Sequence, residues 1–350
     1  MRFRVAVLGA TGMVGRTFLR LLEERSFPAA DVVALASARS AGREVTFAGD
    51  MLRVIAATPD AFDGIDLVLS SAGGSVSRAL LPAAAERGAV SVDNTSAFRM
   101  DPEVPLVVPE VNAHRIIEPL TRGIIANPNC STIQLVVALK PLHDAFGLRR
   151  VLVSTYQSVS GAGQGAVDEL VDSLRAYADD PGAHIGADER SIAFNAVPQI
   201  DTFAADAPGL GPFEGGAETR EEWKMRVETS KIMEVEIPLH ATCVRVPVAA
   251  THGESVWLET ERPIDPDAAR EVLRAAPGLE VLDDPTAGVY PTAVQAAGRD
   301  PVYVGRIRRD PTTPHGLALW IVADNIRKGA ALNAVQIAER LVGHWAANGR

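Results

Sequence analysis

Cys130 occupies a position at which a thiol could act as a nucleophile. It follows Asn127-Pro128-Asn129 and precedes residues 133–146, whose apolar side chains recur at nearly helical spacing. Proline and asparagine interrupt regular structure, so the sequence places Cys130 at or beside a helix N-terminus. The helix dipole and the first amide groups of a helix favour the thiolate, which is the nucleophilic form. A structural cysteine in an apolar core is the alternative, and the polar flanks of Cys130 favour the nucleophile.

Arg245 and His252 could take part in the same reaction. Alternation along residues 241–249 predicts a strand with Cys243 and Arg245 on one face and valines on the other. An arginine there is either solvated or directed into a polar site, where it can bind a carboxylate through two hydrogen bonds. His252 is expected on the loop after this strand, and its imidazole titrates near neutral pH, which suits acid–base catalysis. Most histidines are structural or exposed instead, and Cys243 is expected to be inert packing.

A glycine-rich turn lies near the start of the chain. Phe3 to Leu8 is expected to be a buried strand, the turn Gly9-Ala10-Thr11-Gly12-Met13-Val14-Gly15 follows, and Arg16 to Arg25 is amphipathic with helical spacing. Strand, glycine turn and helix in this order let a pyrophosphate approach the amide groups at a helix N-terminus. Many tight turns contain similar glycines, but this context predicts a dinucleotide-binding turn.

The end of the second expected strand, Val32 to Ala36, distinguishes the two nicotinamide dinucleotides. A site for NAD usually has an Asp or Glu there, which binds the ribose 2′-hydroxyl. The sequence instead continues Ser37-Ala38-Arg39-Ser40-Ala41-Gly42-Arg43, with hydroxyl groups and two arginines but no carboxylate. A solvated loop is the alternative. The pattern favours NADP, whose 2′-phosphate such side chains would bind.

The order of the expected elements predicts the fold class. Strands at Leu67 to Ser71 and Val90 to Asp93 alternate with helices, which predicts an α/β protein with a Rossmann-type, doubly wound parallel sheet. The second half has no further glycine turn of this kind and is expected to be an α+β domain. The last helix, Lys328 to Trp345, has an apolar face that should pack back on the first domain. The predicted division is a cofactor-binding domain of residues 1–130 and 325–350, and a second domain of residues 131–324.

Composition narrows the class of protein. The 350 residues include 34 Lys and Arg against 44 Asp and Glu, a formal net charge of −10, and 47% are apolar. These values are typical of globular proteins and exclude a disordered or collagen-like chain, while the acidity argues against non-specific nucleic-acid binding. No apolar run reaches the length of a membrane span, and no signal peptide is recognisable. Two distant cysteines fit neither a disulfide framework nor a metal site, so we expect a cytoplasmic protein without a metal.

Eight motifs follow one another along the chain: Gly9–Gly15, Ser37–Gly42, Asn94–Arg99, Val108–Asn112, Asn127–Cys130, Ser160–Gly163, Arg245–Val248 and Lys328–Asn333. With these motifs in this order, the chain resembles the aspartate-β-semialdehyde dehydrogenase family over nearly its full length. The resemblance implies NADP-dependent reductive dephosphorylation of L-aspartyl-4-phosphate to L-aspartate 4-semialdehyde through a cysteine thioester. It also implies a role in the biosynthesis of lysine (through diaminopimelate), threonine, methionine and isoleucine, and a homodimer whose second domain is both catalytic and dimerising.

The same resemblance assigns the catalytic and cofactor residues. Cys130 is the nucleophile, and His252 takes the proton when the reaction runs towards the thioester and returns it in the other direction. The expected cofactor contacts are Gly9, Thr11, Gly12, Met13, Val14, Ser37, Arg39, Ser40, Ser160, Gly161 and Asn325.

The resemblance also assigns residues that bind the small-molecule substrate. Gln157 contacts it, Arg245 binds its α-carboxylate, and Glu221 binds its amino group. Arg99 and Lys224 are the implied phosphate ligands.

Helical geometry guides the choice between two neighbouring glutamates. Glu221 and Lys224 are three residues apart and share a helix face, whereas Glu222 and Lys224 are two apart and diverge. We therefore assign Glu221 and keep Glu222 in reserve. An exposed helix with salt bridges is the alternative for this stretch.

Two other functions remain open at this point. N-acetyl-γ-glutamyl-phosphate reductase performs the same chemistry on a longer, acylated substrate, but a free amino group requires a carboxylate, so Glu221 favours the aspartyl compound. A non-catalytic NADP-binding sensor would need the glycine turn but neither Cys130 nor His252.

Overall fold

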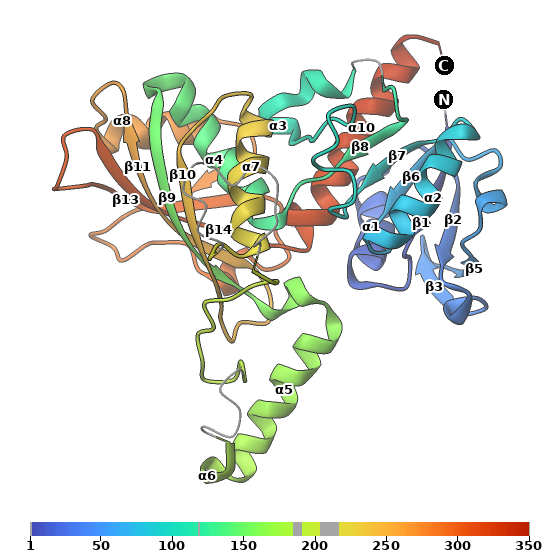
Figure 1. Ribbon diagram of the computed structural model, residues 1–350, viewed down its shortest axis with the longest axis horizontal. Helices are drawn as coiled ribbons and strands as arrows, with labels where there is room; N and C mark the ends of the chain where they lie inside the picture. The colour runs from blue at the N-terminus through green and yellow to red at the C-terminus, as the bar shows by residue number, and fades with distance from the viewer. Residues whose placement is uncertain (1, 118–119, 185–190, 204–216, 350) are drawn as a thin grey trace. The chain divides into compact units, whose positions relative to one another are not determined.

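The computed structural model describes residues 2–117, 120–184, 191–203 and 217–349 (Figure 1). The chain divides into two compact units, Met1–Asn129 with Gly329–Arg350, and Cys130–Lys328.

The first unit is built on a parallel sheet of six strands in the order β5-β2-β1-β6-β7-β8. These strands are β1 (Phe3–Leu8), β2 (Ala29–Ala36), β5 (Ile55–Ala56), β6 (Leu67–Ser70), β7 (Val90–Asp93) and β8 (Ile124–Ala126). Its helices are α1 (Met13–Glu24), α2 (Gly74–Glu86), α3 (Pro109–Asn112) and α10 (Leu332–Ala347), and β3 (Glu44–Phe47) pairs with β4 (Asp50–Arg53) in a hairpin. The chain leaves β1 towards β2 and later returns to β6 on the other side of β1. In doubly wound sheets, ligands bind beside the strand ends at this reversal.

Burial of apolar side chains explains why the two ends of the chain share one unit. Helix α1 buries Phe18, Leu21 and Leu22, and α10 packs against it within the same apolar core. Figure 1 shows α10, in red, among the blue N-terminal elements. The Arg25 guanidinium also donates to both carboxylate oxygens of Glu339, at 2.7 and 2.9 Å.

The second unit contains a mixed sheet of six strands in the order β10-β9-β11-β14-β13-β12. These are β9 (Leu148–Gln157), β10 (Leu239–Arg245), β11 (His252–Thr260), β12 (Leu279–Val281), β13 (Val302–Arg309) and β14 (Gly316–Ala323). Its helices are α4 (Cys130–Phe146), α5 (Gln164–Asp179), α6 (Pro181–His184), α7 (Arg220–Met233), α8 (Pro266–Ala275) and α9 (Ala293–Ala296). Helices α4, α7 and α8 pack on the sheet, where Val256 and Leu258 of β11 are buried. Trp257, between them, is 38% exposed, so the opposite face of the sheet is open at β11, although α9 covers part of it at β13 and β14.

The predicted fold class is confirmed, because a doubly wound parallel sheet and a mixed α+β unit are both present. One local prediction is wrong. His252 is not on a loop but is the first residue of β11, paired with Gln157 of β9 and Ala323 of β14. The chain reverses one residue earlier, at Thr251, whose φ of 75° lies in the left-handed region.

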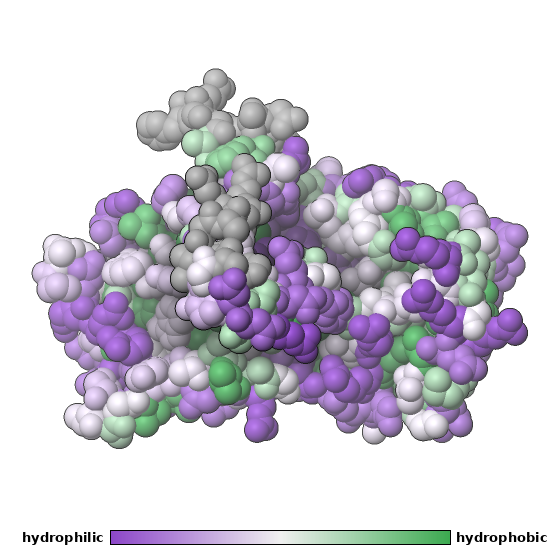
Figure 2. Space-filling model, turned by 90° about the horizontal axis from the view of Figure 1, so that it is seen from below, coloured by the Kyte–Doolittle hydropathy of each residue, from purple (hydrophilic) through white to green (hydrophobic). Residues whose placement is uncertain are grey.

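The surface mixes polar and apolar residues. On the face seen in Figure 2, hydrophilic residues predominate and the hydrophobic ones form small separate groups. Among the described residues, no helix has both the length and the apolar character needed to cross a bilayer.

Candidate active site

Cys130 is the first residue of α4, as its flanking sequence predicts. The helix behind it is held firmly, since every residue from Ser131 to Leu139 is buried. Cys130 itself is half-buried and accessible. Cys243 differs: it is wholly buried in β10, its Sγ lies 3.6 Å from Met225 Sδ, and burial raises the pKa of its thiol. Position and exposure therefore make Cys130 the better candidate for a nucleophile.

His252 is wholly buried beside the segment that follows β9. The Ser158 backbone N–H donates to His252 Nδ1 at 3.0 Å, so the neutral ring carries its proton on Nε2. Burial, followed by the positive charge of Arg245, lowers the pKa of His252 to about 3. Within the described part of the chain, Nε2 has no hydrogen-bond partner. The ring is thus a neutral donor at Nε2. To accept a proton at Nε2, the ring must first adopt the other tautomer, with its proton on Nδ1. The Ser158 hydroxyl lies 3.2 Å from Nδ1 and could accept a hydrogen bond from that Nδ1–H.

Arg245 ends β10 and lies close to His252. Its Nη1 donates to the Ser158 carbonyl. A Cβ added to Gly161 would lie 3.0 Å from Arg245 Nη1 and 3.4 Å from His252 Nε2, so a side chain at Gly161 would press on both groups. Burial lowers the pKa of the Arg245 guanidinium, while the negative charges of Cys130 and Glu221 raise it. Cys130 and the Arg245 guanidinium therefore lie within electrostatic range of each other.

Glu221 and Lys224 of α7 continue this cluster. Gln157 Nε2 donates to Glu221 Oε1 at 3.0 Å, and Lys224 Nζ lies 3.2 Å from Glu221 Oε2. Lys224 also donates to Asp201 Oδ2 at 2.8 Å. Because two carboxylates already face this ammonium, a phosphate bound there must either share the ammonium with them or displace them.

The carboxylate of Glu222 is directed elsewhere. It accepts from the Thr219 backbone N–H at 2.7 Å, in a capping box, and from the Cys243 N–H at 3.0 Å. This use in the fold favours Glu221 over Glu222 as the substrate ligand, an assignment that stays a prediction.

Ser160 and Asn325, two of the expected cofactor contacts, belong to a buried network in the second unit. Asn325 Oδ1 accepts from the Ser158 hydroxyl at 3.1 Å and from the Thr251 backbone N–H at 2.8 Å, and Asn325 Nδ2 donates to Ser160 Oγ at 3.0 Å. These bonds fix the turn before His252. The predicted contacts of Ser160 and Asn325 with a cofactor stay a prediction.

The sequence analysis missed two residues of this cluster, Ser158 and Asp201. Ser158 acts on the imidazole through its main chain, which no residue pattern reveals. Asp201 reaches Lys224 from a separate segment, so only the folded chain brings them together.

The glycine turn lies in the first unit, at the carboxyl end of β1. Gly9 has a φ of 92°, and a Cβ on it would lie 2.6 Å from the Ser71 carbonyl oxygen. A Cβ on Gly15 would lie 2.1 Å from the Gly9 carbonyl oxygen. Gly12 caps α1, with Thr11 before it and Met13 and Val14 in the first turn. The turn thus brings backbone amides to a helix N-terminus at the sheet reversal, which fits a dinucleotide pyrophosphate.

The side chains that the sequence predicts to bind a 2′-phosphate lie just after β2. Ser37 and Arg39 are exposed and Ser40 is buried, in a short 3₁₀ turn after the strand. A cleft of about 410 Å³ lies close by, lined by Thr11, Arg16, Arg43, Glu44, Val45 and Thr46. The structure therefore adds Arg16 to Arg39 and Arg43, the two arginines that the sequence places in this region.

Arg99, the other expected phosphate ligand, is buried in the first unit. Its Nε donates to the Asn127 carbonyl and its Nη2 to the Asn94 carbonyl, both at 2.9 Å. These two bonds fix the guanidinium and the chain three residues before Cys130.

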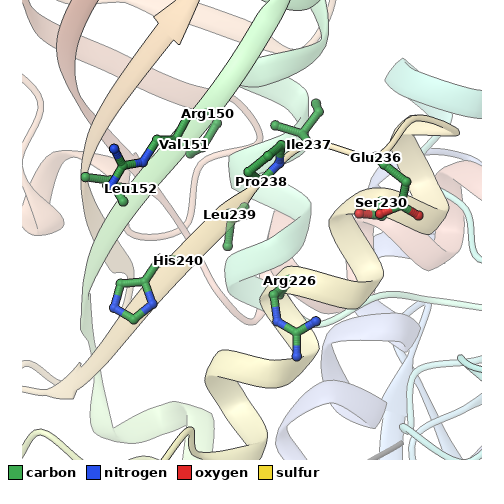
Figure 3. A pocket seen from close by; sticks show the side chains of 10 residues that line it. All are labelled: Arg150, Val151, Leu152, Arg226, Ser230, Glu236, Ile237, Pro238, Leu239 and His240. Carbon is green, nitrogen blue, oxygen red and sulfur yellow. The ribbon is translucent and has the colours of Figure 1, made fainter. Parts of the chain in front are cut away.

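The second unit has a cleft of about 400 Å³, which none of the expected site residues line. Figure 3 shows its lining, which includes Arg150 and Leu152 of β9, His240 of β10 and Arg226 of α7. It lies at the starts of β9 and β10, whereas Gln157 and Arg245 end these strands.

Comparison with known proteins gives full-length matches. Residues 4–118 match the family described as semialdehyde dehydrogenase, NAD binding domain, and residues 139–328 match its dimerisation domain. The aspartate-semialdehyde dehydrogenase of Aquifex aeolicus is 53% identical over 347 residues, which are 98% of each chain. The chain belongs to the aspartate-semialdehyde dehydrogenase family. Cys130 lies between the two matched domains of this family, and His252, Arg245, Glu221 and Lys224 lie within the dimerisation domain.

Solved structures of aspartate-semialdehyde dehydrogenases have the same fold. Enzyme II of Vibrio cholerae, in a complex with ASA, has a TM-score of 0.91 and 46% identity, covering 98% of both chains. The Candida albicans protein, with NADP, has a TM-score of 0.71 and 26% identity, covering 97% of this chain and 98% of its own.

Proposed function

We propose that this protein catalyses the NADP-dependent interconversion of L-aspartyl-4-phosphate and L-aspartate 4-semialdehyde, with release of phosphate in the reductive direction. The observation that carries the proposal is the cluster in the second unit. There, a cysteine at a helix N-terminus lies within electrostatic range of Arg245, and the buried His252 lies beside that arginine. The Vibrio relative, whose structure holds ASA, supports the substrate class.

The cluster suits catalysis through a thioester. Cys130 thiolate attacks the acyl carbon of aspartyl phosphate, forming the C–S bond as the C–O bond to phosphate breaks. Arg99 and Lys224 hold the departing phosphate, and Arg245 and Glu221 bind the α-carboxylate and amino group. His252 Nε2–H donates to the substrate oxygen as it becomes negative. The residues of the glycine turn would hold NADPH, which would supply the hydride needed to reduce the thioester. The C–S bond would then break, with release of the aldehyde and return of Cys130 to the thiolate.

An assay with two substrates tests this proposal. We expect phosphate-dependent reduction of NADP with L-aspartate 4-semialdehyde, and no comparable rate with N-acetyl-L-glutamate 5-semialdehyde, which lacks the amino group that Glu221 would bind. A preference for the N-acetylated substrate would favour the reductase. Binding of NADP without turnover of either aldehyde would favour the sensor.

The choice of NADP over NAD rests on Arg39. We expect Arg39→Asp to raise the KM for NADPH about tenfold or more, since a charge-assisted hydrogen bond is worth about 1.5–3 kcal/mol. The KM for NADH should change little, because NADH has no 2′-phosphate. Arg20→Asp, at an exposed arginine of α1 in the same unit, is the control for the change in charge. Equal losses for both cofactors would contradict the assignment.

We also propose a homodimer formed through the second unit. Of the 16 described residues of α5, Leu170 is the buried one, while Val171 and Leu174 are 37% and 40% exposed. Figure 1 shows α5 extending away from the mixed sheet. Tyr156 and Trp257 are exposed on the open sheet face. A second copy of the chain would cover these apolar side chains, and the match to a dimerisation domain over residues 139–328 supports that occupant.

Leu174→Asp is expected to weaken this dimer. Burying a leucine contributes about 1.5–3 kcal/mol, so the dissociation constant should rise about tenfold or more. Sedimentation velocity at several concentrations measures it, with Asp172→Asn on the other side of α5 as the control. An unchanged dissociation constant for Leu174→Asp would remove α5 from the interface.

The biosynthetic roles in lysine, threonine, methionine and isoleucine formation follow from the proposed reaction. The cytoplasmic location stays a prediction from the sequence.

A further inference from the structure

Glu254 is a buried acid that the proposed reaction does not use. It lies in β11, two residues after His252 and on the same side of the strand, and its exposed area is zero. Neither carboxyl oxygen has a hydrogen-bond partner among the residues that the structure describes. A carboxylate in such a place would lose its hydration, and among the described residues only the nearby Gln134 amide would favour its charged form. Burial accordingly raises the pKa of Glu254 well above its usual value.

Gln134 is the polar neighbour of Glu254. It lies one helical turn after Cys130 in α4 and is wholly buried, and its amide lowers the pKa of the Glu254 carboxyl by less than burial raises it. Its Nε2 donates to the His252 carbonyl oxygen at 3.3 Å. Its Oε1, like the two oxygens of Glu254, has no partner among the described residues. The side-chain oxygens of both residues therefore have no donor among the described residues, because Gln134 Nε2 donates to the His252 carbonyl instead.

A proton on Glu254 removes the buried charge and gives Gln134 Oε1 a donor, because a protonated carboxyl donates one hydrogen bond and an amide oxygen accepts it.

We propose that Glu254 is protonated at neutral pH and donates a hydrogen bond to Gln134 Oε1, which makes it a positioning residue for Cys130 and His252. The bonds then run from Glu254 to Gln134 and from Gln134 to the His252 carbonyl. They join the first turns of α4, which carries Cys130, to the first residue of β11, which is His252. The consequence for turnover rests on the proposed function, whereas the protonation of Glu254 does not.

Infrared spectroscopy tests the protonation. The difference spectrum between the wild-type protein and Glu254→Gln, at neutral pH, should show loss of a carboxylic-acid carbonyl band. Glu259→Gln, on the same strand but the opposite face, should remove carboxylate bands instead. Loss of carboxylate bands in Glu254→Gln would overturn the proposal.

Kinetics and thiol alkylation test the positioning. Glu254→Gln retains a neutral donor of nearly the same shape, so kcat and the rate at which iodoacetamide alkylates Cys130 should stay close to wild type. Glu254→Leu removes the donor, and kcat should fall about tenfold to a hundredfold, the usual cost of misplaced reacting groups, with the KM for semialdehyde nearly unchanged. If Glu254→Leu unfolds at assay temperature, Gln134→Met, which removes the acceptor, should show the same loss of kcat.

The outcomes separate this proposal from the proposed function. The positioning role would be overturned if Glu254→Gln lost as much kcat as Glu254→Leu. It would also be overturned if Glu254→Leu and Gln134→Met both kept wild-type kinetics and wild-type alkylation of Cys130. A wild-type protein without semialdehyde turnover would overturn the proposed function, while the infrared and alkylation measurements would still decide the state of Glu254.

Discussion

Cys130→Ala is expected to lose turnover by about four orders of magnitude or more, because removal of a covalent nucleophile leaves only binding contributions. Affinity for NADP should stay unchanged, since the glycine turn belongs to the other unit. Cys130→Ser should lose almost as much activity, because a serine hydroxyl ionises far less readily than a thiol at neutral pH. Steady-state kinetics and a fluorescence titration with NADPH measure the two effects.

Cys243→Ser is the matched control for this loss. Its thiol is buried against Met225, so the variant should keep most of its activity and lose some thermal stability. An active Cys130→Ala enzyme would contradict the thioester mechanism and leave the cofactor assignment intact.

Arg245→Ala and Lys224→Ala are expected to separate the two ends of the substrate. In the direction of phosphorylation, Arg245→Ala should raise the KM for semialdehyde, and Lys224→Ala the KM for phosphate. Each change should be about tenfold to a hundredfold, because a charge-assisted hydrogen bond contributes about 1.5–3 kcal/mol. Initial rates over a grid of semialdehyde and phosphate concentrations measure both constants. Equal effects of each variant on both substrates would show that the two roles are not separate.

Local sequence pattern predicted the elements that carry the candidate site. The glycines after β1 and the turn-forming residues before Cys130 act within a few residues, so their consequences can be read along the chain. Helical spacing also predicted the Glu221–Lys224 pair, because residues three apart share a face in any α-helix.

The errors and omissions concern contacts between distant segments. His252 was expected on a loop because its own residue pattern does not indicate a strand; its place in β11 depends on pairing with both β9 and β14. Asp201 reaches Lys224 across 23 positions of the chain. The sequence does not reveal the burial of Glu254, because the burial comes from the packing of α4 on β11.

Mass spectrometry of the acyl-enzyme tests the central claim most directly. The protein is mixed with L-aspartyl-4-phosphate without NADPH, quenched in acid and digested, so that the thioester accumulates and survives. The account predicts an aspartyl adduct on the peptide that contains Cys130, and its absence from Cys130→Ala. An adduct confined to the Cys243 peptide, or no adduct in a preparation that is active when NADPH is added, would contradict it.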